Sequence, residues 1–214
     1  MAARVWFTAD THFGHANIIR HSCRPFSSVE EHDRALISNW NGCVGPRDVV
    51  YFLGDFAYKN RDSAEGIRKR LNGTIYFVEG NHDSAAWQIR SMFAAWAQVH
   101  EMKFNVEGVG EGRIFLSHYA HRVWNKSHHG AWHLYGHSHN SLVEEETSLS
   151  FDVGVDAVAA RLGGKPSGRA WSGLRREDYR PLSLEEVAEV MRGKKFVRVD
   201  HHGRGMACEG MGEI

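Results

Sequence analysis

Three polar residues that can bind metal or move protons follow directly on a strand-like run in the first half of the chain. The run Thr74-Ile75-Tyr76-Phe77-Val78-Glu79 is rich in β-branched and aromatic residues, and Gly80-Asn81-His82-Asp83 comes next. Such a sequence is typical of a binding site at the carboxyl end of a strand. Taken alone, it is more simply an ordinary tight turn, because Gly, Asn and Asp favour turns for backbone reasons.

Repetition of the pattern favours chemistry over the turn. Three further strand-like runs end in a carboxylate or an imidazole, at Asp10, Asp55 and His118. The chain has 15 histidines, more than solubility or packing calls for, and histidine is the commonest side chain for metal binding and proton transfer near neutral pH. The candidate site residues, each at or just beyond the end of an apolar run, are Asp10, His12, Asp55, Asn81, His82, His118, His137 and His139.

The residue types in this set indicate a site for two metal ions. Buried carboxylates and imidazoles in such numbers carry a high desolvation cost unless cations offset it. Oxygen and nitrogen ligands without a thiolate suit Mn²⁺, Fe or Zn²⁺ better than Cu(I). The set exceeds what one tetrahedral ion needs, and a carboxylate shared by two ions would hold them ~3.5–4 Å apart, as in two-metal hydrolases.

Five short blocks, taken in order, resemble the signature of the calcineurin-like metallophosphoesterases. The blocks are Asp10-Thr11-His12, Gly54-Asp55, Gly80-Asn81-His82-Asp83, the single His118, and Gly136-His137-Ser138-His139. Their order over residues 10–139 makes the resemblance far more specific than any one block. The opening block, extended to Phe13-Gly14-His15 and followed by Asn17-Ile18-Ile19, is similar to a subgroup of small, single-domain bacterial and phage phosphoesterases.

This resemblance implies a role for each matching residue. The first ion would be bound by Asp10, His12 and His139, the second by Asn81, His118 and His137, and Asp55 would bridge both. His82 would stand over the substrate as a proton donor or phosphate-binding residue, with Asp83 as the residue that could orient it, so these two are the expected catalytic residues. The implied nucleophile is a metal-bridging hydroxide that attacks phosphorus in line with the leaving oxygen.

One departure from the family pattern lies beside His118. The subgroup commonly has proline two residues after this histidine, whereas this chain has Ser117-His118-Tyr119-Ala120, so the resemblance does not predict the shape of this loop. Four other residues lie close in sequence to the expected ligands and could contact phosphate or lie on the surface. Their roles stay open: they are His15, Asn17, His121 and Arg122.

The elements that must position these residues are short strands and helices. Apolar runs predict strands at 5–9, 49–53, 74–79, 102–106, 112–116, 132–135, 149–153 and 196–199, and capping signals with helical periodicity predict helices at 28–40, 63–71, 84–97 and 183–192. This order predicts an α/β fold. We expect a four-layer α-β-β-α sandwich of two mixed sheets flanked by helices, with the metal site at the carboxyl ends of the strands.

Length and composition predict one domain of a cytoplasmic protein. A chain of 214 residues with 42% hydrophobic content can bury a sizeable core, so we expect a single domain over 1–200 and a flexible, Gly-rich tail over 201–214. No apolar run suits a signal peptide or a membrane span. The three distant cysteines, Cys23, Cys43 and Cys208, predict neither a disulfide framework nor a thiolate metal site, as expected in a reducing cytosol.

The expected function is hydrolysis of phosphate esters, with phosphodiesters slightly preferred over monoesters, on a small substrate that could be a nucleotide. The expected cofactors are two divalent ions, Mn²⁺ first and Fe, Zn²⁺, Ni²⁺ or Co²⁺ as alternatives. A nuclease is a second hypothesis: 26 basic residues balance 26 acidic ones, which does not favour nucleic acid, although the basic stretch 161–180 could touch it. An inactive interaction module of this fold fits the complete ligand set less well. The oligomeric state stays open.

Overall fold

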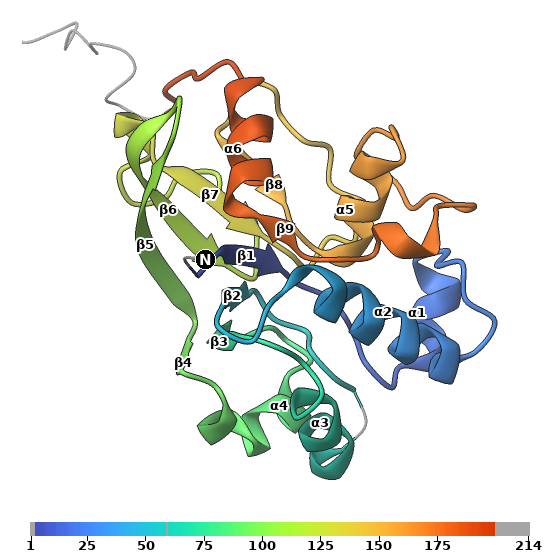
Figure 1. Cartoon of the computed structure of the whole chain (residues 1–214). Coiled ribbons are helices and arrows are strands. Elements are labelled where there is room, and N and C mark those ends of the chain that lie inside the picture. The colour runs from blue at the N-terminus through green and yellow to red at the C-terminus, as the bar shows by residue number, and fades with distance from the viewer. Residues whose placement is uncertain (1–2, 59, 200–214) are drawn as a thin grey trace, which may run out of the picture.

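The first sheet has five strands (Figure 1). The computed structural model describes residues 3–58 and 60–199. In sheet order the strands are β4 (Ala95–Ala97), β3 (Thr74–Val78), β2 (Val49–Phe52), β1 (Val5–Thr8) and β9 (Leu182–Ser183). The first four are parallel and β9 runs antiparallel to β1, so the sheet is mixed.

The second sheet has four strands and is also mixed. In sheet order they are β5 (Val99–Val106), β6 (Gly110–Ser117), β7 (Trp132–Tyr135) and β8 (Ser150–Asp152). The hairpin β5–β6 is antiparallel, whereas β6, β7 and β8 are parallel to one another. Two mixed sheets are what the sequence predicts.

Helices flank the two sheets, which confirms the predicted α/β fold. They are α1 (Ala16–His21), α2 (Val29–Cys43), α3 (Arg61–Arg68), α4 (Ser84–Gln88), α5 (Val155–Leu162) and α6 (Leu184–Arg192), with 3-10 turns η1 (Arg90–Met92), η2 (Ser127–His129) and η3 (Arg176–Asp178). Two helices begin where the sequence predicts because serine side chains cap them. Ser28 accepts a hydrogen bond from the Glu31 backbone, and Ser183 forms a reciprocal capping box with Glu186.

The core lies on both faces of the first sheet. On the outer face, Phe52 and Phe77 belong to one apolar cluster with Trp40 of α2 and Ile67 of α3. On the inner face, Phe7 belongs to a second cluster with residues of β6, β7, β8 and α6. Burial on both faces explains why the strands read as continuous apolar runs.

The predicted helix over 84–97 is wrong beyond Gln88. Helix α4 ends at Gln88, and Ala95–Ala97 forms the edge strand β4. The Trp96 ring stacks on the Phe77 ring with centroids 4.3 Å apart, and the Glu79 backbone N–H donates a hydrogen bond to the Ala97 carbonyl oxygen. Pairing and stacking against β3 therefore outweigh the helical periodicity of this segment.

Smaller differences occur elsewhere. Helix α3 covers 61–68 instead of 63–71, and α1, α5 and β9 are not predicted. Among the described residues, 196–199 form no strand, although Lys195 and Val197 donate backbone hydrogen bonds to Glu146 and Thr147. The expected tail at 201–214 lies outside the described residues. Within 3–58 and 60–199, no helix has the length and apolar character needed to cross a bilayer.

Candidate metal centre

Five strands deliver the candidate ligands. Asp10, Asp55 and Asn81 follow the parallel strands β1, β2 and β3, and His118 and His137 follow the parallel strands β6 and β7. Parallel neighbours end at the same edge of a sheet, and ligands of such sheets bind beyond these carboxyl ends. Residues far apart in sequence therefore meet at one place.

Six of the candidates form two groups that could each hold an ion. The first ligand group is Asp10, His12 and His139, and the second ligand group is Asp55, His118 and His137. Within each group, the carboxylate and imidazole ligand atoms all lie within 4.8 Å of one another. The first group has the same members as the set that the family resemblance implies for the first ion.

Asp55 belongs to the second ligand group and also faces the first. Its Oδ2 atom is 3.4 Å from His12 Nε2 and 3.6 Å from His118 Nε2, and its Oδ1 atom accepts a 2.8 Å hydrogen bond from the His82 backbone N–H. A Cβ atom at Gly80 would lie 2.5 Å from Asp55 Oδ1, so only glycine lets the loop after β3 come so close. A carboxylate in this position can serve two ions at once.

Asn81 stands beside the second ligand group. Its Oδ1 atom is 3.0 Å from His118 Nε2 and 3.1 Å from His137 Nδ1. With bonds of about 2.1 Å, two ligands at a right angle around one ion are about 3.0 Å apart, so these spacings suit a shared cation. His118 donates its Nδ1–H to the Leu53 carbonyl oxygen at 2.7 Å, which leaves Nε2 available for metal.

The titratable groups of the site fit divalent cations. The Nε2 atom of His12 is buried and has no hydrogen-bond partner among the described residues. Burial, with the nearby Arg24 guanidinium, lowers the pKa of His12, so its imidazole is uncharged at neutral pH and can offer a lone pair to a metal ion. Burial raises the pKa of Asp10 well above its usual value. A cation here would offset the cost of keeping that carboxylate charged, and would give His12 a partner.

Backbone strain marks the same residues. Positive φ angles occur at Asp10 (59°), His12 (49°), Asp55 (59°), His137 (68°) and His139 (46°). The left-handed conformation costs a residue with a Cβ atom roughly 1–2 kcal/mol, and such strain concentrates at functional sites. Neighbouring backbone holds two of them in place: Asp10 N–H donates to the Gly54 carbonyl at 2.9 Å, and His12 N–H donates to the Asp55 carbonyl at 3.0 Å.

A buried ion-pair network supports the first ligand group. Asp156, in the first turn of α5, lies 2.6 Å from His139 Nδ1. Its other contacts are with Arg24, whose Nε and Nη2 atoms donate to the carboxylate at 2.9 and 2.8 Å. The same guanidinium donates to the backbone carbonyls of Asp10 and Thr11. Arg24 and Asp156 thus hold the loop after β1 and the His139 ring in fixed positions relative to each other.

This network fixes the orientation of His139. Since Asp156 holds Nδ1, the Nε2 atom is the one left for metal. Burial lowers the pKa of His139, but the hydrogen bond that its Nδ1–H donates to Asp156 and the charge of Asp10 raise this pKa to about 9, so an ion would displace a proton on binding. Sequence reasoning missed Arg24 and Asp156, because neither lies in a motif and they are 132 residues apart.

We expect Asp156→Asn to weaken metal binding at the first ligand group by roughly 10–100-fold, the usual cost of losing a residue that orients a ligand. The second ligand group should keep nearly its wild-type affinity. Titration of the metal-free protein with Mn²⁺, followed by calorimetry, resolves the two affinities.

The matched control for this variant is Asp178→Asn. Asp178 and Asp156 are both 4% exposed, and Asp178 also pairs with an arginine, Arg175, at 2.8 Å, which is not part of the site. Equal weakening at both ligand groups, or the same loss in the control, would contradict the positioning role of Asp156.

His82 and Asp83, the expected catalytic residues, lie in different surroundings. The His82 ring is exposed, with its centroid 5.6 Å from that of His12. Asp83 is buried, and its carboxylate accepts hydrogen bonds from the backbone N–H groups of Asp55, Phe56 and Gly80 at 2.9, 2.8 and 2.7 Å. These bonds tie Asp83 to the loops after β2 and β3, where it positions Asp55, and its catalytic role beside His82 stays a prediction.

The four residues with open roles lie at two places. His15 stacks on Tyr58 with ring centroids 4.0 Å apart and lies 5.5 Å from the His12 ring, so it borders the first ligand group, and Asn17 is exposed in α1. His121 and Arg122 are exposed in the loop after β6 and line a separate pocket.

Comparison with known proteins gives one family and several relatives. The profile of the calcineurin-like phosphoesterase family matches residues 3–161. An uncharacterized protein of Methanocaldococcus jannaschii is 31% identical over 202 residues, which cover 91% of this chain and 95% of that protein. The gene 66 protein of Mycobacterium phage L5 is 26% identical over 185 residues, with 72% of this chain and 87% of that protein covered. A protein of unknown function from Aquifex aeolicus has a similar fold, with a TM-score of 0.59, 21% identity and coverage of 88% of this chain and 100% of that one.

Proposed function

Because the chain belongs to the calcineurin-like phosphoesterase family, we propose that it hydrolyses phosphate esters with two divalent ions, Mn²⁺ first, and prefers phosphodiesters to monoesters. The observation that carries this proposal is the place of Asp55, whose Oδ2 atom faces His12 at 3.4 Å and His118 at 3.6 Å. Two ions bound by these groups would polarise the phosphate and make a coordinated water more acidic.

The proposed proton donor to the leaving group is His82. Its ring is exposed beside the first ligand group, where it can donate a proton to the departing ester oxygen. Its backbone N–H donates a hydrogen bond to Asp55 at 2.8 Å, so the loop that carries the proton donor is tied to the carboxylate that faces both ligand groups. This hydrogen bond keeps His82 at a fixed distance from Asp55. Such an arrangement suits a reaction in which the leaving oxygen must lie near both residues.

Aromatic side chains on both sides of the site favour diesters. Tyr58, stacked on His15, borders the first ligand group and is 51% exposed. Tyr119 borders the second, with ring centroids 5.0 Å from His118 and 4.6 Å from His137. A diester carries an organic group on two of its phosphate oxygens, so apolar surface on either side of phosphorus suits it better than a monoester.

The charges around the site favour a small ester over nucleic acid. The arginines of the basic stretch 161–180 are largely engaged with carboxylates: Arg161 pairs with Glu144, Arg176 with Glu31 and Arg180 with Glu186. Binding of a nucleic-acid backbone draws its affinity from cations that are free to meet phosphates. These three are already neutralised within the chain.

Exhaustive chelation should abolish hydrolysis of bis(p-nitrophenyl) phosphate, and Mn²⁺ should restore it in proportion to the ions bound, up to two per chain. The reason is that the nucleophile of the proposed reaction is a water made more acidic by the two ions, and chelation removes these ions. Release of p-nitrophenolate and metal content are measured on the same samples during reconstitution. Full turnover by the metal-free protein would overturn the proposal, and so would a protein that binds two ions but hydrolyses neither diesters nor monoesters.

A further inference from the structure

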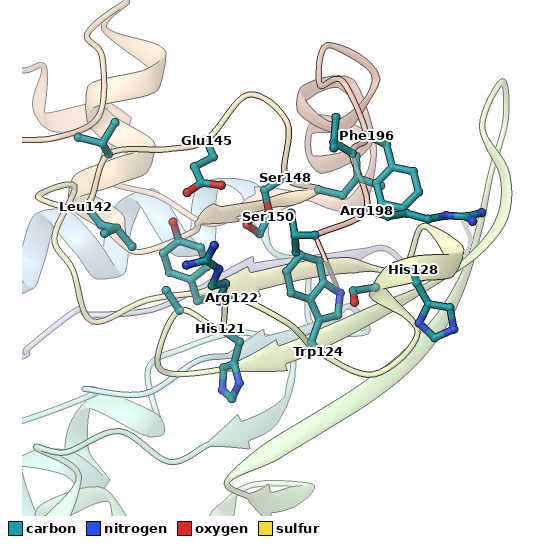
Figure 2. A pocket seen from close by; sticks show the side chains of 17 residues that line it. His121, Arg122, Trp124, His128, Leu142, Glu145, Ser148, Ser150, Phe196 and Arg198 are labelled. Atoms are coloured by element: carbon teal, nitrogen blue, oxygen red, sulfur yellow. Dashed lines mark hydrogen bonds between the residues drawn. The ribbon is translucent and has the colours of Figure 1, made fainter. Parts of the chain in front are cut away.

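A hollow that contains none of the candidate ligands lies against the second sheet (Figure 2). Its volume is about 280 Å³, near the lower end of the range for small-molecule pockets. Tyr135 of β7 and Ser150 of β8 line it together with Trp124 from the loop after β6 and Phe196 near the end of the described chain. None of these residues belongs to either ligand group.

The hollow adjoins a groove that reaches the second ligand group. A shallow groove lined by His137 and Tyr119 shares two residues, Ala120 and Leu142, with the pocket. Tyr135 is two residues before His137, and two residues span at most about 7 Å of chain. A ligand of modest size can therefore lie in the pocket while a phosphate attached to it reaches the second ligand group.

Flat rings and mixed hydrogen-bonding groups line the pocket. Phe196 is 42% exposed and offers an accessible ring face on which a planar group can stack. The Arg122 guanidinium points into the hollow, opposite the Glu145 carboxylate (Figure 2), and has no hydrogen bond or ion pair with the described residues. The hydroxyl oxygens of Ser148 and Ser150 lie 2.9 Å apart. The lining thus offers two guanidinium groups, those of Arg122 and Arg198, one carboxylate and several hydroxyls around an apolar surface.

We propose that this pocket binds the nucleoside part of the substrate, so that the enzyme acts on phosphodiesters of a single nucleotide; this rests on the proposed function. A nucleobase is planar and carries donors and acceptors on one edge, which matches a lining that holds Arg122, Glu145 and two serines. A purely anionic group would meet the Glu145 carboxylate, and a volume of about 280 Å³ holds one nucleoside and excludes an oligonucleotide.

The test compares two substrates with the same leaving group. Adenosine 5′-(p-nitrophenyl) phosphate and bis(p-nitrophenyl) phosphate both release p-nitrophenolate, so their difference reports on the nucleoside. Phe196→Ala and Arg122→Glu should each raise KM for the nucleoside ester roughly tenfold more than KM for the aryl ester, the size expected for one lost stacking or charged contact to a base. Arg47→Glu, an exposed arginine in the turn before β2, is the matched control and should leave the ratio of the two KM values as in the wild type.

A binding measurement separates failure of the pocket from failure of the proposed function. Calorimetry of adenosine with the metal-free protein and with Phe196→Ala needs no catalysis. Binding that the variant weakens supports the pocket even if neither ester is hydrolysed, in which case the phosphoesterase proposal alone fails. Hydrolysis of the aryl ester with no nucleoside effect in either variant, and no binding of adenosine, would overturn the pocket and leave the phosphoesterase proposal in place.

Discussion

Replacing Asp55 by alanine should lower kcat/KM for a phosphodiester by roughly a thousandfold or more and weaken the binding of both ions together. Every other ligand candidate lies in one group, whereas Asp55 Oδ2 faces His12 and His118 at 3.4 and 3.6 Å. Its loss also frees the His82 backbone N–H, which is bonded to Asp55 Oδ1. One substitution therefore disturbs both ligand groups and the turn that carries the proton donor.

The measurement for Asp55→Ala is metal content per chain together with kcat/KM on bis(p-nitrophenyl) phosphate. His139→Ala and His118→Ala serve as comparisons, because each removes a ligand candidate from one group and should leave the other group able to bind. Asp62→Ala is the matched control, since Asp62 is an exposed carboxylate in the first turn of α3. Two tightly bound ions and substantial turnover in Asp55→Ala would refute the shared position of this carboxylate.

The ligand candidates could be predicted from sequence because their signal is local. Asp10, Asp55 and His118 each follow an apolar run within a residue or two, and the carboxyl end of a buried strand is where an α/β sheet presents its ligands. The backbone conformation at Asp10 and Asp55, with φ at 59° in both, could not be predicted this way. The residue type alone does not predict a left-handed backbone conformation at these two aspartates, because the packing of the surrounding loop imposes that conformation.

The sequence alone does not distinguish aspartates that stabilise the loops by hydrogen bonds from aspartates that could bind metal. Asp83 accepts three backbone N–H groups from the loops after β2 and β3. Asp33 accepts the Gly14 N–H after β1, and Asp152 accepts the Ser138 hydroxyl after β7 at 2.7 Å. In sequence each is one more acidic residue, because the partner of a carboxylate depends on tertiary contacts. The sequence alone therefore groups Asp83 with His82, its neighbour in the chain.

The limits of prediction for the fold are also tertiary. Periodicity at 84–97 predicts one helix. However, the Trp96 ring stacks on the Phe77 ring with centroids 4.3 Å apart, and residues 95–97 pair with β3 instead. Helix α5 escapes prediction because most of its residues are buried, so it lacks the polar face that helical periodicity needs. This missed helix carries Asp156, and with it the link between His139 and Arg24.

The loss of kcat/KM on replacing His82 should increase with how strongly the leaving group needs a proton. General acid catalysis is typically worth ~10²–10⁴-fold, and an alkoxide needs the proton far more than p-nitrophenolate, which departs readily as an anion. We therefore expect His82→Ala to lose much more kcat/KM on an alkyl or ribose diester than on an aryl diester. Metal content should stay as in the wild type, because the His82 side chain belongs to neither ligand group.

The alternative role for His82 is a clamp on the phosphate, and the two roles give different rates. A clamp holds the phosphate whatever the leaving group, so its removal lowers both rates by similar factors, whereas an acid acts only on the departing oxygen. The measurement is kcat/KM for the wild type and His82→Ala on an aryl and an alkyl diester, with bound metal quantified in both proteins. His129→Ala, an exposed histidine of η2, is the matched control. Equal losses on the two esters would reject the acid role, and loss of metal in His82→Ala would place this side chain among the ligands.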